Sequence, residues 1–327
     1  MKGYSVQPNK NIFTVYAGLI ASGYDLSELN CDTEIYKLLR KVQIKESIVS
    51  YFRRARTLSC KVNPYWPRAF LLSLSSLYIT EKSPYTYKDF EKLLNHIMNL
   101  SQINPKEKNE DLIDWIHQLP SIIEKLQHNA EIQQSWLQFL SVLIEKTKIY
   151  DLIVKESYEV VKNNLDVLEN DLPEIIIIPN YLQAPQVTDV VAIEEKIYVI
   201  NSNPDKESII HELLHQVFDN KLEECKDLID MFLPLLKPVL DEMINYQYAW
   251  SYNEDSWNRV FEENLIRAAS AWTNYNDDIN NARKNAESHK EYGFIYVPII
   301  FESFILNWKG INEFRGFIKN CLNACSN

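Results

Sequence analysis

The sequence predicts an α+β fold that is mostly α-helical: a helical N-terminal half, a small mixed or antiparallel sheet, and a second helical half. Three observations support this class. Only 6 of the 327 residues are glycine, well below the usual share of about 7%, which disfavours turn-rich all-β folds and Gly-rich phosphate-binding loops. Helical spacing of apolar residues dominates both halves of the chain. A short β-branched stretch separates them.

The first 168 residues are expected to form successive amphipathic helices. Apolar side chains recur at helical spacing over 35–44, 90–98 and 113–126. Pro120 is expected to break the third of these stretches, because proline removes a backbone donor and clashes with the preceding turn. Further helices are predicted over 136–154 and 158–168.

The pattern changes to extended structure at Pro173. Residues 174–178 are β-branched, bounded by prolines and too few for a helix. Residues 187–193 and 196–201 predict a hairpin, with Glu194 and Glu195 between its strands. The remainder is expected to be helical.

Asn203 and Pro204 suit the N-cap and the first position of the helix that follows the hairpin. Later helices are expected to be interrupted at Pro234 and Pro238 and near Gly293 and Gly310. At the usual domain size this chain suggests two domains. We place a helical N-terminal domain at 1–168 and a second domain at 169–327.

Composition restricts the partners. The formal net charge is −11, which disfavours binding to nucleic acid or to anionic membrane surfaces. No apolar run approaches the length of about 20 residues that a membrane span requires, and the first residues lack the apolar core of a signal peptide. Five scattered cysteines fit reduced thiols. We therefore expect a cytoplasmic protein; its oligomeric state is left open.

The strongest chemical signal is the motif formed by His211, Glu212 and His215. Histidines four residues apart lie one turn apart on a helix, so both imidazoles can bind one zinc ion at about 2.0–2.1 Å. Glu212 then lies beside the ion, where it can act as a general base. An apolar stripe for the core runs along the same helix: Ile209, Ile210, Leu213, Leu214, Val217 and Phe218. The alternative is a pair of surface histidines that share this spacing by chance.

The segment 211–219, HELLHQVFD, resembles the zinc helix of the gluzincin metallopeptidases, the thermolysin-like class, in the form HELxHxVxD. The resemblance implies one Zn²⁺ per chain, a zincin-like catalytic half and hydrolysis of peptide substrates. Metzincins are disfavoured, because Phe218 stands where their glycine would be and no histidine follows until His289.

The resemblance also implies a third ligand, a glutamate on a later helix. The helix predicted over 257–272 carries Glu262 and Glu263, and Glu263 lies 48 residues after His215 (263 − 215). Residues 263–268 are similar to the ExxxR(A) arrangement of uncharacterised bacterial gluzincin-like proteins, which favours Glu263. Helical phasing leaves Glu262 open, and both could be solvated surface charges.

One position departs from the thermolysin pattern. Arg267 stands where that family has an aspartate that orients a zinc histidine. Asp219, one turn after His215, is a candidate for the orienting role. Arg267 is expected either to form a salt bridge with the carboxylates of the site or to bind a substrate carboxylate.

The class further implies two elements that contact substrate. A tyrosine or histidine from the C-terminal part would stabilise the oxyanion; we choose Tyr296, then Tyr292. A sheet edge would pair with the substrate backbone, supplied by 196–201, which includes Tyr198, or by 190–196. The alternatives are a zinc amidase acting on non-peptide substrates, or a helical interaction or regulatory protein with a structural zinc site or without activity.

Overall fold

The computed structural model describes residues 3–23, 34–62, 69–79, 85–99, 110–167, 172, 174–183, 187–194, 196–202, 205–243, 257–275 and 277–326. The chain divides into two compact units. The N-terminal unit comprises Ser5–Tyr150 and Ile175–Pro204, and the C-terminal unit comprises Met1–Tyr4, Asp151–Glu174 and Asp205–Asn327. The described residues are mostly helical with one small sheet, so the predicted fold class is confirmed.

The N-terminal unit contains helices around one apolar core. These are α1 (Lys10–Ala21), α2 (Glu34–Leu39), α3 (Glu46–Val62), α4 (Phe70–Leu77), α5 (Tyr87–Asn99), α6 (Glu110–Gln127) and the first part of α7 (Ala130–Leu165). A β-carbon at Gly18 of α1 would lie under 3 Å from both the Phe52 ring of α3 and the Leu126 side chain of α6. Glycine at this position therefore permits the close approach of the three helices.

Two expectations about helix breaks between residues 113 and 168 were wrong. Pro120 lies inside α6, whose helix continues through it. Leu119, Ile122 and Ile123 around it are buried in the core, so tertiary packing offsets the cost of the missing hydrogen bond. The helices expected over 136–154 and 158–168 are one helix, α7, because none of the residues between them stops a helix; Ser157 donates its hydroxyl to the carbonyl of Ile153 at 2.8 Å.

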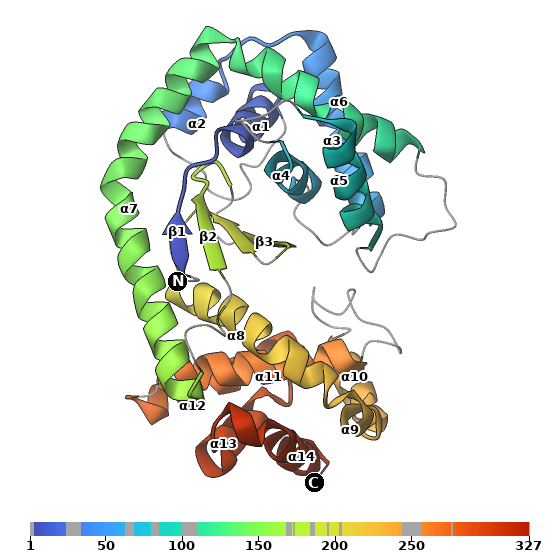
Figure 1. Ribbon diagram of the computed structural model, residues 1–327, viewed down its shortest axis with the longest axis vertical. Helices are drawn as coiled ribbons and strands as arrows, with labels where there is room; N and C mark the ends of the chain where they lie inside the picture. The colour runs from blue at the N-terminus through green and yellow to red at the C-terminus, as the bar shows by residue number, and fades with distance from the viewer. Residues whose placement is uncertain are drawn as a thin grey trace. The chain divides into compact units, whose positions relative to one another are not determined.

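The sheet contains β1 (Tyr4–Val6), β2 (Glu174–Pro179), β3 (Thr188–Ile193) and β4 (Lys196–Asn201), in the order β1-β2-β4-β3. Figure 1 labels β1, β2 and β3 of this sheet. β3 and β4 form the predicted antiparallel hairpin, in which Ile193 pairs with Lys196. Its turn places Glu194 at φ +56°. Ile176, Ile178, Val191 and Ile200 belong to the same core as α1 and α4.

The strand order corrects the prediction of a free edge at 196–201. β4 lies between β2 and β3, so its backbone is paired on both sides. β3, the other strand considered, does lie at an edge of the sheet. Among the described strands at this end of the sheet, β3 rather than β4 is therefore placed to accept an added strand, and substrate binding there stays a prediction.

The C-terminal unit contains α8 (Lys206–Glu223), α9 (Lys226–Asp230), α10 (Leu236–Met243), α11 (Trp257–Asn274), α12 (Ile279–Ser288), α13 (Val297–Asn307) and α14 (Phe314–Cys325), together with the end of α7. Short 3₁₀ turns occur at Leu233–Leu235, His289–Tyr292 and Ile311–Glu313. Pro234 lies in the first turn, and Gly293 and Gly310 follow helix ends at φ +87° and +96°. Pro238 does not break a helix, because it occupies the first turn of α10.

The boundary predicted at 168 differs from this division, because the three strands after it group with the N-terminal helices. Whether 1–168 and 169–327 are separate domains stays a prediction. Among the described residues, no helix combines the length and apolar character needed to cross a membrane.

Candidate metal centre

Helix α8 presents the histidine motif in the C-terminal unit. It begins at Lys206, two residues later than expected, because Asp205 is the N-cap: its carboxylate accepts the backbone N–H of Ser208 at 2.9 Å. Asn203 and Pro204, the expected start, lie outside the described residues. As predicted, the apolar stripe is buried, comprising Ile209, Ile210, Leu213, Leu214, Val217 and Phe218. The motif residues remain partly accessible beside this stripe.

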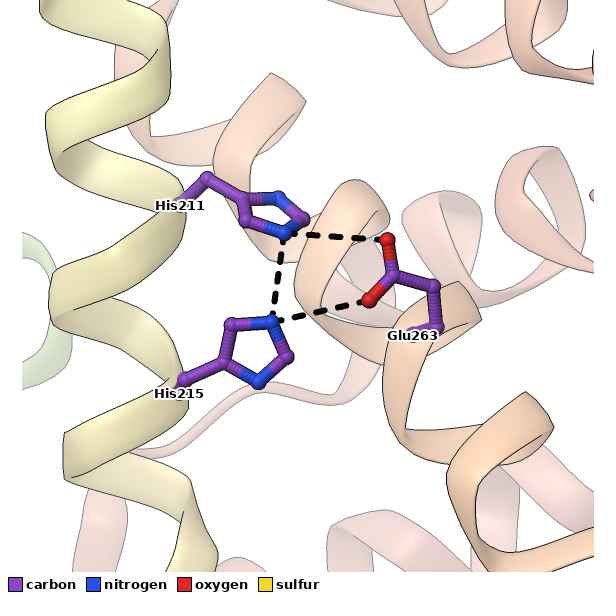
Figure 2. A group of neighbouring side chains, drawn as sticks. All are labelled: His211, His215 and Glu263. Carbon is purple, nitrogen blue, oxygen red and sulfur yellow. Dashed lines mark hydrogen bonds and ion pairs between the residues drawn. The ribbon is translucent and has the colours of Figure 1, made fainter. Parts of the chain in front are cut away.

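Helix α11 packs alongside α8 and places Glu263 opposite both histidines (Figures 1 and 2). Nε2 of His211 lies 3.2 Å from Nε2 of His215. Oε1 of Glu263 lies 3.6 Å from Nε2 of His211, and Oε2 lies 3.5 Å from Nε2 of His215. The three side chains are only 15–21% exposed. The structure thus brings together all three residues that were predicted as ligands.

These separations fit one divalent ion. Ligand atoms at about 2.0–2.1 Å from a tetrahedrally coordinated zinc lie about 3.3 Å from one another, close to the three measured distances. The donor set of two imidazoles and one carboxylate is also the set that leaves a coordination position open in catalytic zinc sites. The residues therefore fit a zinc ion.

The electrostatics of His211 and Glu263 favour metal binding, whereas His215 must first lose a proton. Burial lowers the pKa of His211 to about 3, so its imidazole is neutral, the form that binds metals. Burial raises the pKa of Glu263, but Arg267, His211 and His215 outweigh this and hold it well below its usual range. Burial lowers the pKa of His215, yet its hydrogen bonds to Glu262 and Glu263 raise it to about 11. A metal ion bound to Nε2 of His215 would therefore have to displace a proton from this imidazole.

Glu262 has a different position from Glu263. Its Oε1 accepts a hydrogen bond from Nδ1 of His215 at 2.8 Å, which leaves Nε2 directed at the ligand group (Figure 2). Asp219, which sequence analysis considered for this role, forms a second group with Glu262 and His215. Burial and the neighbouring Glu262 raise the pKa of Asp219 to about 6. Glu262 is thus the direct partner of His215, and Asp219 lies next to it.

Arg267 contacts Glu263, the candidate ligand on α11. Nη2 of Arg267 lies 2.6 Å from Oε1 of Glu263, one helical turn earlier on α11. Of the two roles expected for Arg267, the structure shows the salt bridge with a carboxylate of the site. Binding of a substrate carboxylate stays a prediction, and this ion pair gives it no support.

Glu212 follows His211 on α8 and is partly buried. Burial raises the pKa of its carboxyl to about 7, with His215 lowering and Glu263 raising it. A carboxylate with a pKa near neutrality is suited to accept and release a proton.

The two predicted tyrosines are not part of this group. The hydroxyl of Tyr296 donates to the backbone carbonyl of Leu235 at 2.9 Å, and its ring packs against Trp257. Tyr198 lies on β4 in the N-terminal unit. Tyr292 is 46% exposed. The catalytic and substrate-binding roles of Tyr296 and Tyr198 stay predictions.

A cavity of about 320 Å³ borders the second acidic group. Its lining includes Asp219 and Glu262, and it continues along α8, α9 and α11 through Leu222, Glu223, Lys226, Ile229 and Asn258. Since Glu262 contacts both this cavity and His215, the cavity lies beside the histidine pair.

Comparison with known proteins gives no relative: no protein-family model, no curated protein and no solved structure matches this chain.

Proposed function

We propose that this chain is a zinc-dependent metallopeptidase. The observation that carries the proposal is the convergence of His211, His215 and Glu263, with ligand atoms 3.2–3.6 Å apart, beside a glutamate on the same helix. The resemblance of 211–219 to the gluzincin zinc helix supports peptide hydrolysis as the reaction.

Each residue then has a defined part. His211 and His215 would hold the ion through Nε2, and Glu263 through its carboxylate. A bound zinc ion acidifies water and polarises a carbonyl group. Glu212 accepts the proton of the attacking water and passes it to the leaving amine, which its pKa near 7 permits. Glu262 fixes the orientation of His215 through Nδ1.

Cysteine burial and net charge bear on the compartment and partners that we propose, and the donor groups of the site bear on the alternative functions. Cys225, Cys321 and Cys325 are buried free thiols, which is in keeping with a reducing cytoplasm. A net charge of −11 disfavours nucleic acid and anionic membranes as partners. An amidase acting on non-peptide substrates would use the same groups. A structural zinc site has no need of the carboxylate of Glu212 beside it.

The test combines metal analysis with peptide digestion. We expect one zinc per wild-type chain, loss of zinc in Glu263→Ala, and one zinc bound with lower affinity in Glu262→Ala. Glu212→Gln should keep the zinc and lose peptide cleavage by about 10²–10⁴-fold, the usual contribution of a general base. Identical digests of a peptide library by wild type and Glu212→Gln would contradict the mechanism. Cleavage of simple amides but of no peptide would favour the amidase.

A further inference from the structure

Arg267 is held on three sides. Its Nη2 lies 2.6 Å from Oε1 of Glu263, and its Nη1 lies 3.4 Å from Nδ1 of His289. The guanidinium carbon lies 4.1 Å from the centre of the Phe294 ring, a cation–π distance. The side chain is 21% exposed. Three different side chains thus fix the guanidinium group.

The contact with Glu263 affects how this carboxylate can meet a metal ion. A guanidinium only donates hydrogen bonds, and a charge-assisted bond to a carboxylate is strong and directional. Arg267 therefore contacts Oε1, which also lies 3.6 Å from Nε2 of His211, while Oε2 faces Nε2 of His215 at 3.5 Å without this competition. The two oxygens of one carboxylate are consequently inequivalent.

His289 and Phe294 give the arginine little freedom to move. Because the guanidinium can only donate, Nδ1 of His289 must accept, and its ring proton lies on Nε2. Both residues come from the segment after α12, around the turn at Gly293. This segment therefore supports the ligand on α11 through Arg267.

We propose that Arg267 is a positioning residue that restrains Oε1 of Glu263, so that the carboxylate binds the metal ion through one oxygen and leaves coordination positions for water and substrate. The inference rests on the proposed metal site but does not require that the site hydrolyses peptides. A Glu263 released from Arg267 would turn both oxygens to the ion.

The experiment replaces zinc with cobalt(II), whose visible absorption reports the coordination number and geometry. Wild type is compared with Arg267→Met, which loses the hydrogen bonds, and with Arg267→Lys, which keeps the charge but not the planar fork. We expect both variants to change the cobalt spectrum toward a higher coordination number. Zinc affinity is measured in the same variants by chelator competition.

Two further variants complete the test. Arg283→Met removes an exposed Arg283–Glu302 ion pair and should leave the cobalt spectrum as in wild type. Phe294→Leu removes the aromatic ring beside the guanidinium group and should change the cobalt spectrum in the same direction as Arg267→Lys. This variant tests the positioning role even if Arg267→Met does not fold.

The outcomes separate the two proposals. Unchanged cobalt spectra in folded Arg267→Lys and Phe294→Leu would overturn the positioning role. Tighter zinc binding in Arg267→Met with an unchanged cobalt spectrum would also overturn it, because the loss of a positive charge alone would produce that result. A wild type that binds cobalt but cleaves no peptide would overturn only the peptidase. A wild type that binds no metal would overturn both.

Discussion

Asp189 gives a quantitative prediction that is independent of the metal centre. It lies on β3 in the N-terminal unit and is only 2% exposed. Burial raises the pKa of its carboxyl to about 7, although the polar side chains of Ser73, Tyr16 and Gln183 lower it. These partners are all uncharged, so no cation compensates for the ionised form among them. Ionisation of Asp189 should therefore destabilise the folded unit.

The difference between the folded and unfolded pKa of Asp189 determines how the free energy of unfolding changes with pH. An unfolded aspartate titrates at its ordinary pKa of 3.8, so between pH 3.8 and about 7 the folded state binds more protons and stability falls as pH rises. Each pH unit in that window is worth about 1.36 kcal/mol. Full ionisation at pH 8 therefore costs the folded state up to about 4 kcal/mol, and the cost is constant at higher pH.

Replacing Asp189 with asparagine removes this cost while keeping the shape. We expect Asp189→Asn to match wild type near pH 4 and to exceed its free energy of unfolding by up to about 4 kcal/mol at pH 8. Urea unfolding at a series of pH values measures the difference. Glu194→Gln, at a hairpin position whose side chain is 77% exposed, is the control and should change stability by less than about 0.5 kcal/mol. A wild-type-to-variant difference that stays flat from pH 4 to 8 refutes the reasoning.

Two further predictions concern the metal centre and the helical core. Glu262→Gln removes the charged acceptor from Nδ1 of His215 and should weaken zinc binding about 10–100-fold by chelator competition; exposed Glu287→Gln is the control, and equal affinities would contradict the orienting role. Gly18→Ala would place its β-carbon under 3 Å from Phe52 and Leu126 and should lower the free energy of unfolding by about 1–3 kcal/mol. At Gly316 a β-carbon would meet no atom within 4 Å, so Gly316→Ala should raise the free energy of unfolding by about 0.5–1 kcal/mol through helix propensity. If both alanine variants changed the free energy of unfolding in the same direction, close packing at Gly18 would be contradicted.

The local sequence pattern was sufficient to predict those structural features that depend on residues close together in the sequence. The spacing of His211 and His215 places both imidazoles on one side of α8, and the β-branched runs around Glu194 form the predicted hairpin. The order of strands was not predictable in this way, because the position of β4 between β2 and β3 depends on pairing between distant segments. The continuity of α6 through Pro120 likewise depends on burial of its neighbours in the core.

The choice between Glu262 and Glu263 shows why helical phasing alone could not assign the ligand. Both carboxylates approach His215, but from opposite sides of its ring: Glu263 faces Nε2 and Glu262 binds Nδ1. Neighbouring residues on a helix differ by about 100° in direction, so a single imidazole between α8 and α11 can contact both. What distinguishes ligand from partner is which ring nitrogen each carboxylate reaches, and that depends on how the two helices pack.

The same packing explains why the arginine at 267 is compatible with a metal site. An aspartate at that position, as in the thermolysin pattern, would add a negative charge; Arg267 instead neutralises part of the charge of Glu263. The orienting carboxylate is then supplied one residue before the ligand, by Glu262 on Nδ1 of His215. In the proposed site, α11 would carry the orienting carboxylate one residue before the ligand glutamate, the reverse of the order in the thermolysin pattern, and Arg267 would be the cation that restrains the ligand.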